Sequence, residues 1–272
     1  MPNLLQPGDP APFGIENADA ASPIVFASDH AGRAIPARLG DLGLEEAELA
    51  RHIGWDIGIH GVTRALARAL DAVYVFQPYS RLVIDCNRRP GNGQSIVLSS
   101  DGTVVPANQN LSEDEKRARE DEILRPYHRE LGRVLEERKA AKRATVMFLM
   151  HSCTPRLRVD PKPRPWEIGI LANRDWRVGN AMIELLRAET DLCVGRNEPY
   201  VVSEEADYTL PLHAEEGGLP CVEIEIRQDL IAEPEGQAEW ARLLADICPR
   251  AVELAGVLGP QNAPRIAART AG

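Results

Sequence analysis

The sequence lacks the segments that direct a chain to membranes, to secretion or to nucleic acids. No apolar run approaches the ~20 residues needed to span a bilayer, so a membrane partner is not expected. Residues 1–20 have neither a basic n-region nor an apolar h-region, which predicts no signal peptide and a cytoplasmic location. The 31 Lys and Arg are outnumbered by 41 Asp and Glu, the net charge is −10, and no basic block occurs. Nucleic acid is therefore not an expected partner.

The sequence also lacks a disulfide framework and a thiolate metal motif. It has five cysteines, an odd number, and none of them is in CxxC spacing. Four of the five lie within or beside apolar runs. This pattern predicts buried free thiols in a reducing compartment.

Internal repeats and long linkers are absent as well, which bounds the domain organisation. The chain has 272 residues, of which 44% are hydrophobic and 26% charged, enough to form a sizeable core. We expect an extended N-terminal arm over 1–22, a single α/β domain over 23–258 and a C-terminal tail over 259–272.

Short apolar runs alternate with segments of helical spacing. The predicted strands are 24–28, 73–76, 82–85, 146–150, 167–171, 192–194 and 222–226. The predicted helices are 45–70, 112–143, 176–189 and 235–257; a capping box of Ser112 and Glu115 begins the second, which should be kinked or interrupted near Pro126. Most of the strand runs are continuous rather than alternating, which is typical of strands covered on both faces. The expected fold is α/β, three α/β/α layers around a mostly parallel sheet.

Two histidines follow predicted strands in matching positions. His30 follows 24–28 and His151 follows 146–150, so parallel neighbouring strands would place both rings at one edge of the sheet. A catalytic metal site needs a third ligand, and Asp56, in the apolar stretch "HIGWDIG", is the leading candidate. Asp29 is one alternative, and a local pair of His52 and Asp56 at helical spacing is another.

Arginines and an asparagine surround another predicted strand, in "YSRLVIDCNRR". Its polar residues are Arg81, Asp85, Asn87, Arg88 and Arg89. An arginine beside an asparagine after a strand suits bidentate capture of a substrate carboxylate. The alternative is a solvated loop with surface arginines.

A third stretch, "CVEIEIRQDLI", alternates apolar and charged side chains. The alternation places Glu223, Glu225 and Arg227 on one face of a strand. Either that face is the polar side of an edge strand, or one glutamate is a general base in a pocket. Spacing alone does not choose between Glu223 and Glu225.

Two other classes of function stay open from these residues. Ser152 and Cys153 directly follow His151, which makes a serine or cysteine hydrolase one alternative. The chain has no GxSxG elbow, however, and adjacent side chains on a strand point apart. A non-catalytic carboxylate-binding protein is the second alternative.

Seven stretches together resemble the N-formylglutamate amidohydrolase family. They are "SDHAGRAIP" (28–36), "HIGWDIG" (52–58), "YSRLVIDCNR" (79–88), "HSCTP" (151–155), "GRNEPY" (195–200), "YTLPLHAEEGGLP" (208–220) and "VEIEIRQDLI" (222–231). Their order and approximate spacing match too, so the resemblance covers roughly 23–245.

The resemblance implies a fold and an activity. The family looks related to zinc carboxypeptidases and aspartoacylases, which implies a mixed sheet between helices. It implies one metal ion per chain, Zn²⁺ or another divalent metal, carried by His30, Asp56 and His151. The implied reaction is hydrolysis of a small anionic N-acyl amino acid, with N-formyl-L-glutamate to formate and L-glutamate as reference. The acyl group, the amino acid and the oligomeric state stay open.

The resemblance also implies roles for individual side chains. Asn87 and Arg88 resemble the carboxylate-binding pair of carboxypeptidases. Glu225, followed by Ile226, resembles their catalytic glutamate better than Glu223 does. Arg81 or Arg88 would then stabilise the oxyanion or hold the α-carboxylate.

Three further positions concern the edges of the implied site. Arg227 would orient Glu225 or bind a side-chain carboxylate, and His213 falls in a loop that either closes over substrate or lies on the surface. Position 33 departs from the carboxypeptidase pattern, because Arg33 stands where those enzymes have a glutamate ligand. Asp56 would have to replace that ligand.

Overall fold

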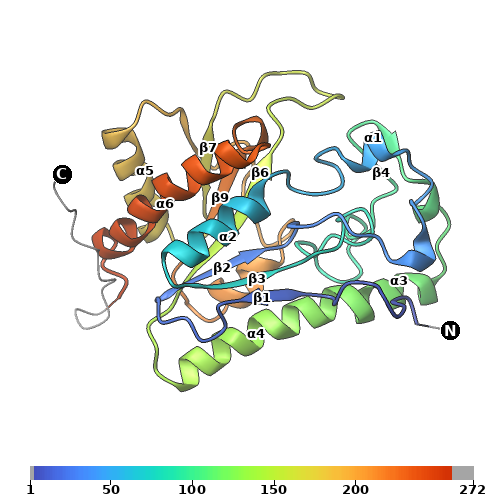
Figure 1. Ribbon diagram of the computed structural model, residues 1–272, viewed down its shortest axis with the longest axis horizontal. Helices are drawn as coiled ribbons and strands as arrows, with labels where there is room; N and C mark the ends of the chain where they lie inside the picture. The colour runs from blue at the N-terminus through green and yellow to red at the C-terminus, as the bar shows by residue number, and fades with distance from the viewer. Residues whose placement is uncertain (1–2, 259–272) are drawn as a thin grey trace.

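A seven-stranded mixed sheet runs through the centre of the molecule, in a computed structural model that describes residues 3–258 (Figure 1). Its strands are β1 (Gly14–Glu16), β2 (Ile24–Ser28), β3 (Val73–Phe76), β6 (Val146–Cys153), β7 (Ile168–Leu171), β8 (Val194–Arg196) and β9 (Cys221–Arg227). A separate hairpin pairs β4 (Ser99–Ser100) with β5 (Thr103–Val104). The predicted tail, 259–272, lies outside the described residues.

The strand order across the sheet is β1-β3-β2-β6-β9-β7-β8. β1 is antiparallel to β3 and β7 is antiparallel to β9, while the other four neighbouring pairs are parallel. The prediction of a mixed, mostly parallel sheet between helices is therefore confirmed. β2, β6 and β9 are consecutive parallel neighbours, so their carboxyl ends lie together at one edge.

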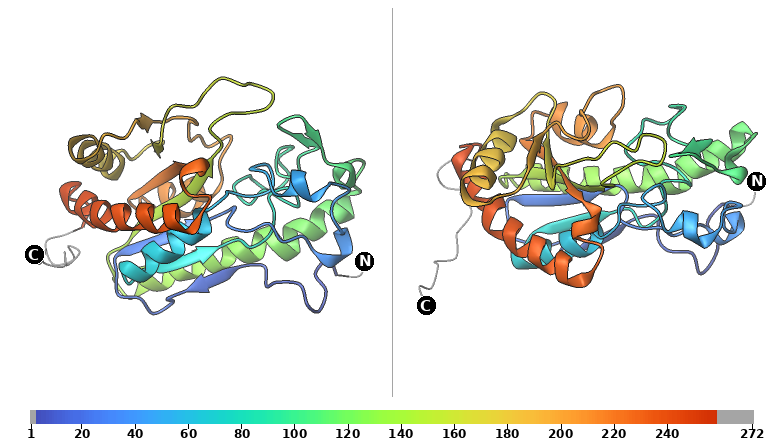
Figure 2. Two further views of the ribbon diagram at one scale, coloured as in Figure 1. Left: turned by 45° about the horizontal axis from the view of Figure 1, so that its top comes forward. Right: turned by 90° about the horizontal axis from the view of Figure 1, so that it is seen from above.

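Helices cover both faces of this sheet. They are α1 (Glu46–Leu49), α2 (Ile59–Ala69), α3 (Glu113–Arg119), α4 (Arg125–Ala140), α5 (Arg177–Glu189) and α6 (Pro234–Leu254). Short 3-10 turns lie at Ala37–Leu39, Pro106–Asn108 and Gln228–Leu230, and π-turns at Glu120–Leu124 and Pro211–Glu215. Figure 2 shows α2 and α6 on one side of the sheet and α4 on the other. Of the helices in residues 3–258, none combines the length and the apolar character that crossing a bilayer requires.

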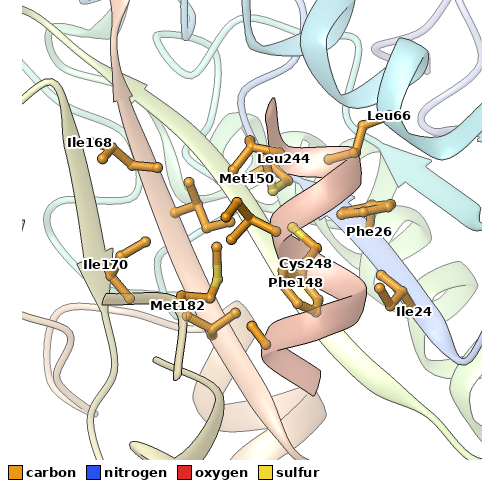
Figure 3. Close-up of a cluster of buried hydrophobic side chains, with 14 of the residues drawn as sticks. Ile24, Phe26, Leu66, Phe148, Met150, Ile168, Ile170, Met182, Leu244 and Cys248 are labelled. Atoms are coloured by element: carbon orange, nitrogen blue, oxygen red, sulfur yellow. The ribbon is translucent and has the colours of Figure 1, made fainter. Parts of the chain in front are cut away.

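The larger core cluster fills the space between the sheet and α2, α5 and α6 (Figure 3). Phe26 of β2 and Phe148 of β6 are register partners with ring centroids 5.7 Å apart. Leu244 and Cys248 of α6 and Met182 of α5 belong to the same cluster. The alternate residues of β2 and β6 face the opposite cluster, which packs under α4. The continuous apolar runs thus reflect strands buried on both faces.

Two sequence predictions need correction. Residues 82–85 form a turn rather than a strand, although Leu82, Val83 and Ile84 are buried. A short apolar run cannot be told from a buried loop by periodicity alone. The expected helix 45–70 is broken: only α1 and α2 are helical, and 50–58 is a series of turns.

Two other local predictions are confirmed, the cap at Ser112 and the interruption near Pro126, while the strand predicted at 192–194 is found at Val194–Arg196. Ser112 caps α3, and Glu115 completes the capping box. The long helix that begins there is interrupted by the π-turn Glu120–Leu124, directly before Arg125 and Pro126. In the region expected as an extended arm, β1 adds an antiparallel strand to the sheet edge.

Gly58 fixes the turn that carries Asp56 into α2. Its φ is +80°, and a Cβ at this position would overlap the carbonyl oxygen of Ile231. We expect Gly58→Ala to lower the free energy of unfolding by about 2–4 kcal/mol, since left-handed backbone strain and overpacking add. Gly218→Ala is the matched control, because Gly218 has a φ of +66° but open space around it. Its expected cost is about 1–2 kcal/mol. Equal losses in urea titrations of the two variants would contradict the clash.

Candidate functional site

A cavity of about 240 Å³ opens at the carboxyl ends of β2, β6 and β9. His30 follows β2, His151 lies on β6, and Glu223 and Glu225 lie on β9; all four line the cavity. The turns 50–58 and 81–88 and the segment 200–207 complete its walls. Three distant parts of the chain meet here because the parallel strand ends share one edge.

The structure brings His30, Asp56 and His151 together at the base of the cavity. Their exposed fractions are 2–3%, and one ligand atom from each lies within 4.8 Å of the others. His30 Nδ1 is 3.5 Å and His151 Nδ1 is 2.7 Å from Asp56 Oδ2, and the two rings are 5.0 Å apart. Bonds of about 2 Å to one ion place tetrahedral ligands about 3.3 Å apart. The three side chains have the spacing that a shared cation needs.

Each histidine turns its other ring nitrogen to a second carboxylate. His30 Nε2 donates to Asp85 Oδ1 at 2.7 Å, and His151 Nε2 lies 3.6 Å from Asp29 Oδ2. Asp29 Oδ1 in turn accepts hydrogen bonds from the hydroxyl groups of Tyr127, 2.7 Å, and Thr209, 2.9 Å. A carboxylate behind a metal-binding imidazole fixes its tautomer and its orientation.

The buried charges favour a cation at this point. Burial raises the pKa of Asp56, but the neighbouring His30 and His151 outweigh it and hold that pKa well below its usual value. Burial and Arg81 disfavour charge on His30, yet Asp85 and Asp56 leave its pKa raised. His30 Nδ1 is buried and has no hydrogen-bond partner among residues 3–258. Two imidazoles and a carboxylate with an unused lone pair suit Zn²⁺.

Glu223 and Glu225 face the cavity from the same side of β9. Glu225 is the register partner of His151, and Glu223 is that of Leu149. Burial raises the pKa of Glu225 to about 7 and raises that of Glu223 well above its usual value. The Oε2 atom of each carboxyl group has no hydrogen-bond partner in the described part of the chain. A carboxyl group with a pKa near neutrality can both accept and return a proton.

Arg81 lies in the cavity wall next to the three candidate ligands. Its Nη2 donates to Asp85 Oδ2 at 2.8 Å, and its Nη1 is 3.5 Å from Asp56 Oδ1. The guanidinium is therefore held by two carboxylates, while the Arg81 side chain remains 28% exposed and lines the cavity.

Asn87 and Arg88 line the cavity, and both already bind a carboxylate. Asp207 Oδ1 accepts hydrogen bonds from Asn87 Nδ2, 3.2 Å, and Arg88 Nη1, 3.1 Å. Asn87 Oδ1 accepts the backbone N–H groups of Tyr208 and Thr209, both at 3.0 Å. The pair has the carboxylate chemistry expected of it, and the chain's own segment occupies it.

Two predicted site residues lie away from the cavity. Arg227 donates from Nε to Asp229 at 2.8 Å and from Nη1 to the Pro165 carbonyl at 3.2 Å. His213, in the π-turn Pro211–Glu215, stacks on His128, with 2.9 Å between the ring nitrogens. The structure thus does not bring Arg227 or His213 to the other candidates.

The structure does not support the local His52–Asp56 pair or a nucleophile at Ser152 or Cys153. His52 does not share a helical face with Asp56, since 50–58 is not helical; its Nε2 lies 3.5 Å from Asp101 instead. Ser152 Oγ donates to the Ile57 carbonyl at 2.9 Å, and burial raises the pKa of the Cys153 thiol. Neither side chain is an activated nucleophile.

Sequence reasoning missed Asp207, Thr209 and Tyr127. Thr209 and Tyr127 act through Asp29, and Asp207 acts on the Asn87–Arg88 pair. The position of Tyr208 and Thr209 at the start of "YTLPLHAEEGGLP" was the available signal. These residues lie 98 to 180 positions from their hydrogen-bond partners in the chain, and local sequence patterns do not encode such distant contacts.

Known proteins resemble this chain in sequence and in structure. The family model described as N-formylglutamate amidohydrolase matches residues 22–232. The crystal structure of gene product Atu2144 from Agrobacterium tumefaciens is 36% identical, with a TM-score of 0.88, over 92% of this chain and 98% of that one. N-formylglutamate amidohydrolase from Ralstonia eutropha JMP134 is 22% identical, with a TM-score of 0.68, over 90% and 97%. No curated protein matches the sequence.

Proposed function

Because the chain belongs to the N-formylglutamate amidohydrolase family, as its match over residues 22–232 shows, we propose that it is a metal-dependent hydrolase of a small anionic N-acyl amino acid. The reference reaction is N-formyl-L-glutamate and water to formate and L-glutamate. The observation that carries the proposal is the meeting of His30, Asp56 and His151 beside Glu225 in one cavity.

His30, Asp56 and His151 would hold one divalent ion, and their donor atoms favour Zn²⁺. An ion there would polarise the amide carbonyl and ease attack by water at neutral pH. Asp85 keeps His30 in the tautomer whose Nδ1 is free, because it accepts the proton on Nε2.

Glu225 is the proposed proton carrier. Its carboxylate accepts a proton from the attacking water as the new C–O bond forms, and it returns that proton to the amide nitrogen as the C–N bond breaks. Burial among cavity residues keeps its pKa about 7, which suits both transfers. The products are a carboxylic acid and a free amine.

Arg81 is proposed to bind the carbonyl oxygen as it gains negative charge. Arg81 contacts Asp56, a candidate ligand, and Asp85, which binds His30, whereas the carboxylate partner of Arg88 is Asp207. Arg88 and Asn87 are then left for the substrate carboxylate. Arg227 is 2.8 Å from Asp229 and has no role in these steps.

A substrate screen with metal analysis tests the proposal. The purified protein should contain about one equivalent of zinc per chain and should release amine from N-formyl-L-glutamate in a panel of N-acyl amino acids. Release of no amine from any member of the panel by zinc-loaded protein would contradict it. A binding protein would retain ligand affinity without turnover.

The second carboxylate behind His30 provides a separate prediction. We expect Asp85→Asn to weaken the affinity for Zn²⁺ about ten- to hundredfold, because the imidazole loses its charged acceptor. Competition with a chromophoric chelator measures this affinity. Asp175→Asn, which removes an aspartate paired with Arg177 outside the cavity, is the matched control. An affinity for Asp85→Asn equal to that of the control would mean that Asp85 does not orient a ligand.

We also propose that the enzyme works in the cytoplasm. All five cysteines, within the described residues, are free thiols, and four of them are buried. Free thiols persist in a reducing compartment.

A further inference from the structure

Arg88 and Asn87 form a carboxylate site that is filled by a residue of the chain. Asp207 Oδ1 receives one hydrogen bond from each of them, at 3.1 and 3.2 Å. Both donors line the cavity, and so does Asp207, which is 9% exposed. The contacts with Asp207 show that this site can bind a carboxylate, because a guanidinium and an amide both donate to one carboxylate oxygen.

Asp207 is fixed by its own segment as well. Its Oδ2 accepts the Ser203 backbone N–H at 2.9 Å, and its backbone N–H donates to the Ser203 carbonyl at 2.9 Å. These contacts form a closed turn that presents the carboxylate to Arg88. The neighbouring Tyr208 and Thr209 bind Asn87 through backbone groups and do not depend on the Asp207 side chain.

Burial makes the charged form of the Asp207 carboxylate unfavourable at this position. Burial raises the pKa of Asp207 in spite of Arg88 and the Ser203 backbone contact, so its charged form is less favourable here than in water. The cavity wall beside it also carries the buried carboxyl groups of Glu223 and Glu225. Exchange of Asp207 for another carboxylate at Arg88 would preserve the ion pair and return Asp207 to water.

We propose that Asp207 is a specificity-determining residue that competes with the α-carboxylate of the substrate for Arg88. The inference rests on the proposed function for its substrate, an N-acyl amino acid. Substrate binds productively only in molecules whose Asp207 has left Arg88. If Asp207 holds Arg88 about 90% of the time, the apparent affinity for substrate is about tenfold below its intrinsic value. Compounds without an α-carboxylate cannot displace Asp207 and gain nothing from its removal.

The test is the variant Asp207→Asn, assayed with two substrates. For N-formyl-L-glutamate we expect KM to fall about tenfold while kcat stays within about twofold. For the same compound with its α-carboxylate replaced by carboxamide, KM should not fall. Asp229→Asn is the matched control, since Asp229 also pairs with an arginine, Arg227, but outside the cavity. A KM for N-formyl-L-glutamate that is unchanged or higher in Asp207→Asn would overturn the proposal.

Binding of L-glutamate, measured by calorimetry, separates this inference from the proposed function. A tenfold tighter Kd in Asp207→Asn supports the competition even if neither protein hydrolyses any substrate. An equal or weaker Kd contradicts it even if both proteins are active enzymes.

The wild-type protein offers an independent measurement if the variant does not fold. Displacement of Asp207 frees the Ser203 N–H, so saturating L-glutamate should speed hydrogen exchange in the peptide 203–207. Unchanged or slower exchange there would also overturn the proposal.

Discussion

Glu225→Gln should lower kcat for N-formyl-L-glutamate by a factor of about 10²–10⁴ and leave the zinc content at the wild-type level. The amide has nearly the shape of the carboxyl group but cannot accept a proton from water, and a positioned general base contributes about this factor. Steady-state rates of formate release and metal analysis of the same preparation measure both quantities. A binding protein without catalysis would show no turnover to lose.

Glu223→Gln is the matched control for that variant. Glu223 lies two residues away, on the same face of the same strand, and is equally buried. Its register partner is Leu149, whereas that of Glu225 is the candidate ligand His151. We therefore expect Glu223→Gln to keep most of kcat. A larger loss in Glu223→Gln than in Glu225→Gln would exchange the two roles.

His151→Ala should abolish both zinc binding and activity, with kcat/KM reduced by more than about 10³. The change removes one of three candidate ligands and leaves Asp56 without the partner 2.7 Å away. Loss of a ligand lowers the affinity for the ion, and without the ion the carbonyl is not polarised. Metal content after dialysis and rates before and after added ZnCl₂ measure the effect.

Two controls accompany the histidine variant. His60→Gln changes a histidine on α2 whose Nδ1 lies 3.2 Å from the Tyr74 hydroxyl and which is not among the residues that line the cavity. It should retain zinc and activity. Wild-type protein treated with a chelator should lose activity and regain it with Zn²⁺. Full activity of either the chelated enzyme or His151→Ala would contradict metal dependence.

The positions of the candidate residues on or beside sheet strands could be predicted from the sequence. His30 follows β2, and His151 lies near the carboxyl end of β6, which extends beyond the predicted 146–150 to Cys153. A strand end fixes a side chain within narrow limits. Glu225 was placed on one face of β9 by simple alternation, and its face is the one that lines the cavity. Strand periodicity and the common edge of parallel strands were sufficient for these residues.

Residues on turns could be predicted less completely. Asp56 lies between α1 and α2 in a stretch expected to be helical, and its place depends on turns stabilised through Gly54 and Gly58. The strand expected at 82–85 is a buried turn that carries Arg81 to the cavity. Tertiary packing decided both cases, because apolar content alone does not separate strands from buried turns.

The hydrogen-bond partners of side chains in loops could not be predicted from the sequence. Arg227 pairs with Asp229, and His213 with His128, instead of entering the cavity. Arg88 binds Asp207, which is 119 residues away in the chain. Several acceptors can satisfy an arginine equally well, and only the folded arrangement selects one.

The two faces of β9 link the position of Glu225, the proposed proton carrier, to the hydrophobic interior. Val222, Ile224 and Ile226 belong to the large core cluster, and Glu223 and Glu225 alternate with them toward the cavity. A slip of one residue against β6 would bury both acids among aliphatic side chains and expose three aliphatic side chains to the cavity. Such a misaligned form would lose both the acids in the cavity and the burial of the aliphatic side chains. The register of the proposed proton carrier is thus set by close apolar packing on the opposite face of its strand, and its Oε2 atom has no hydrogen-bond partner among residues 3–258.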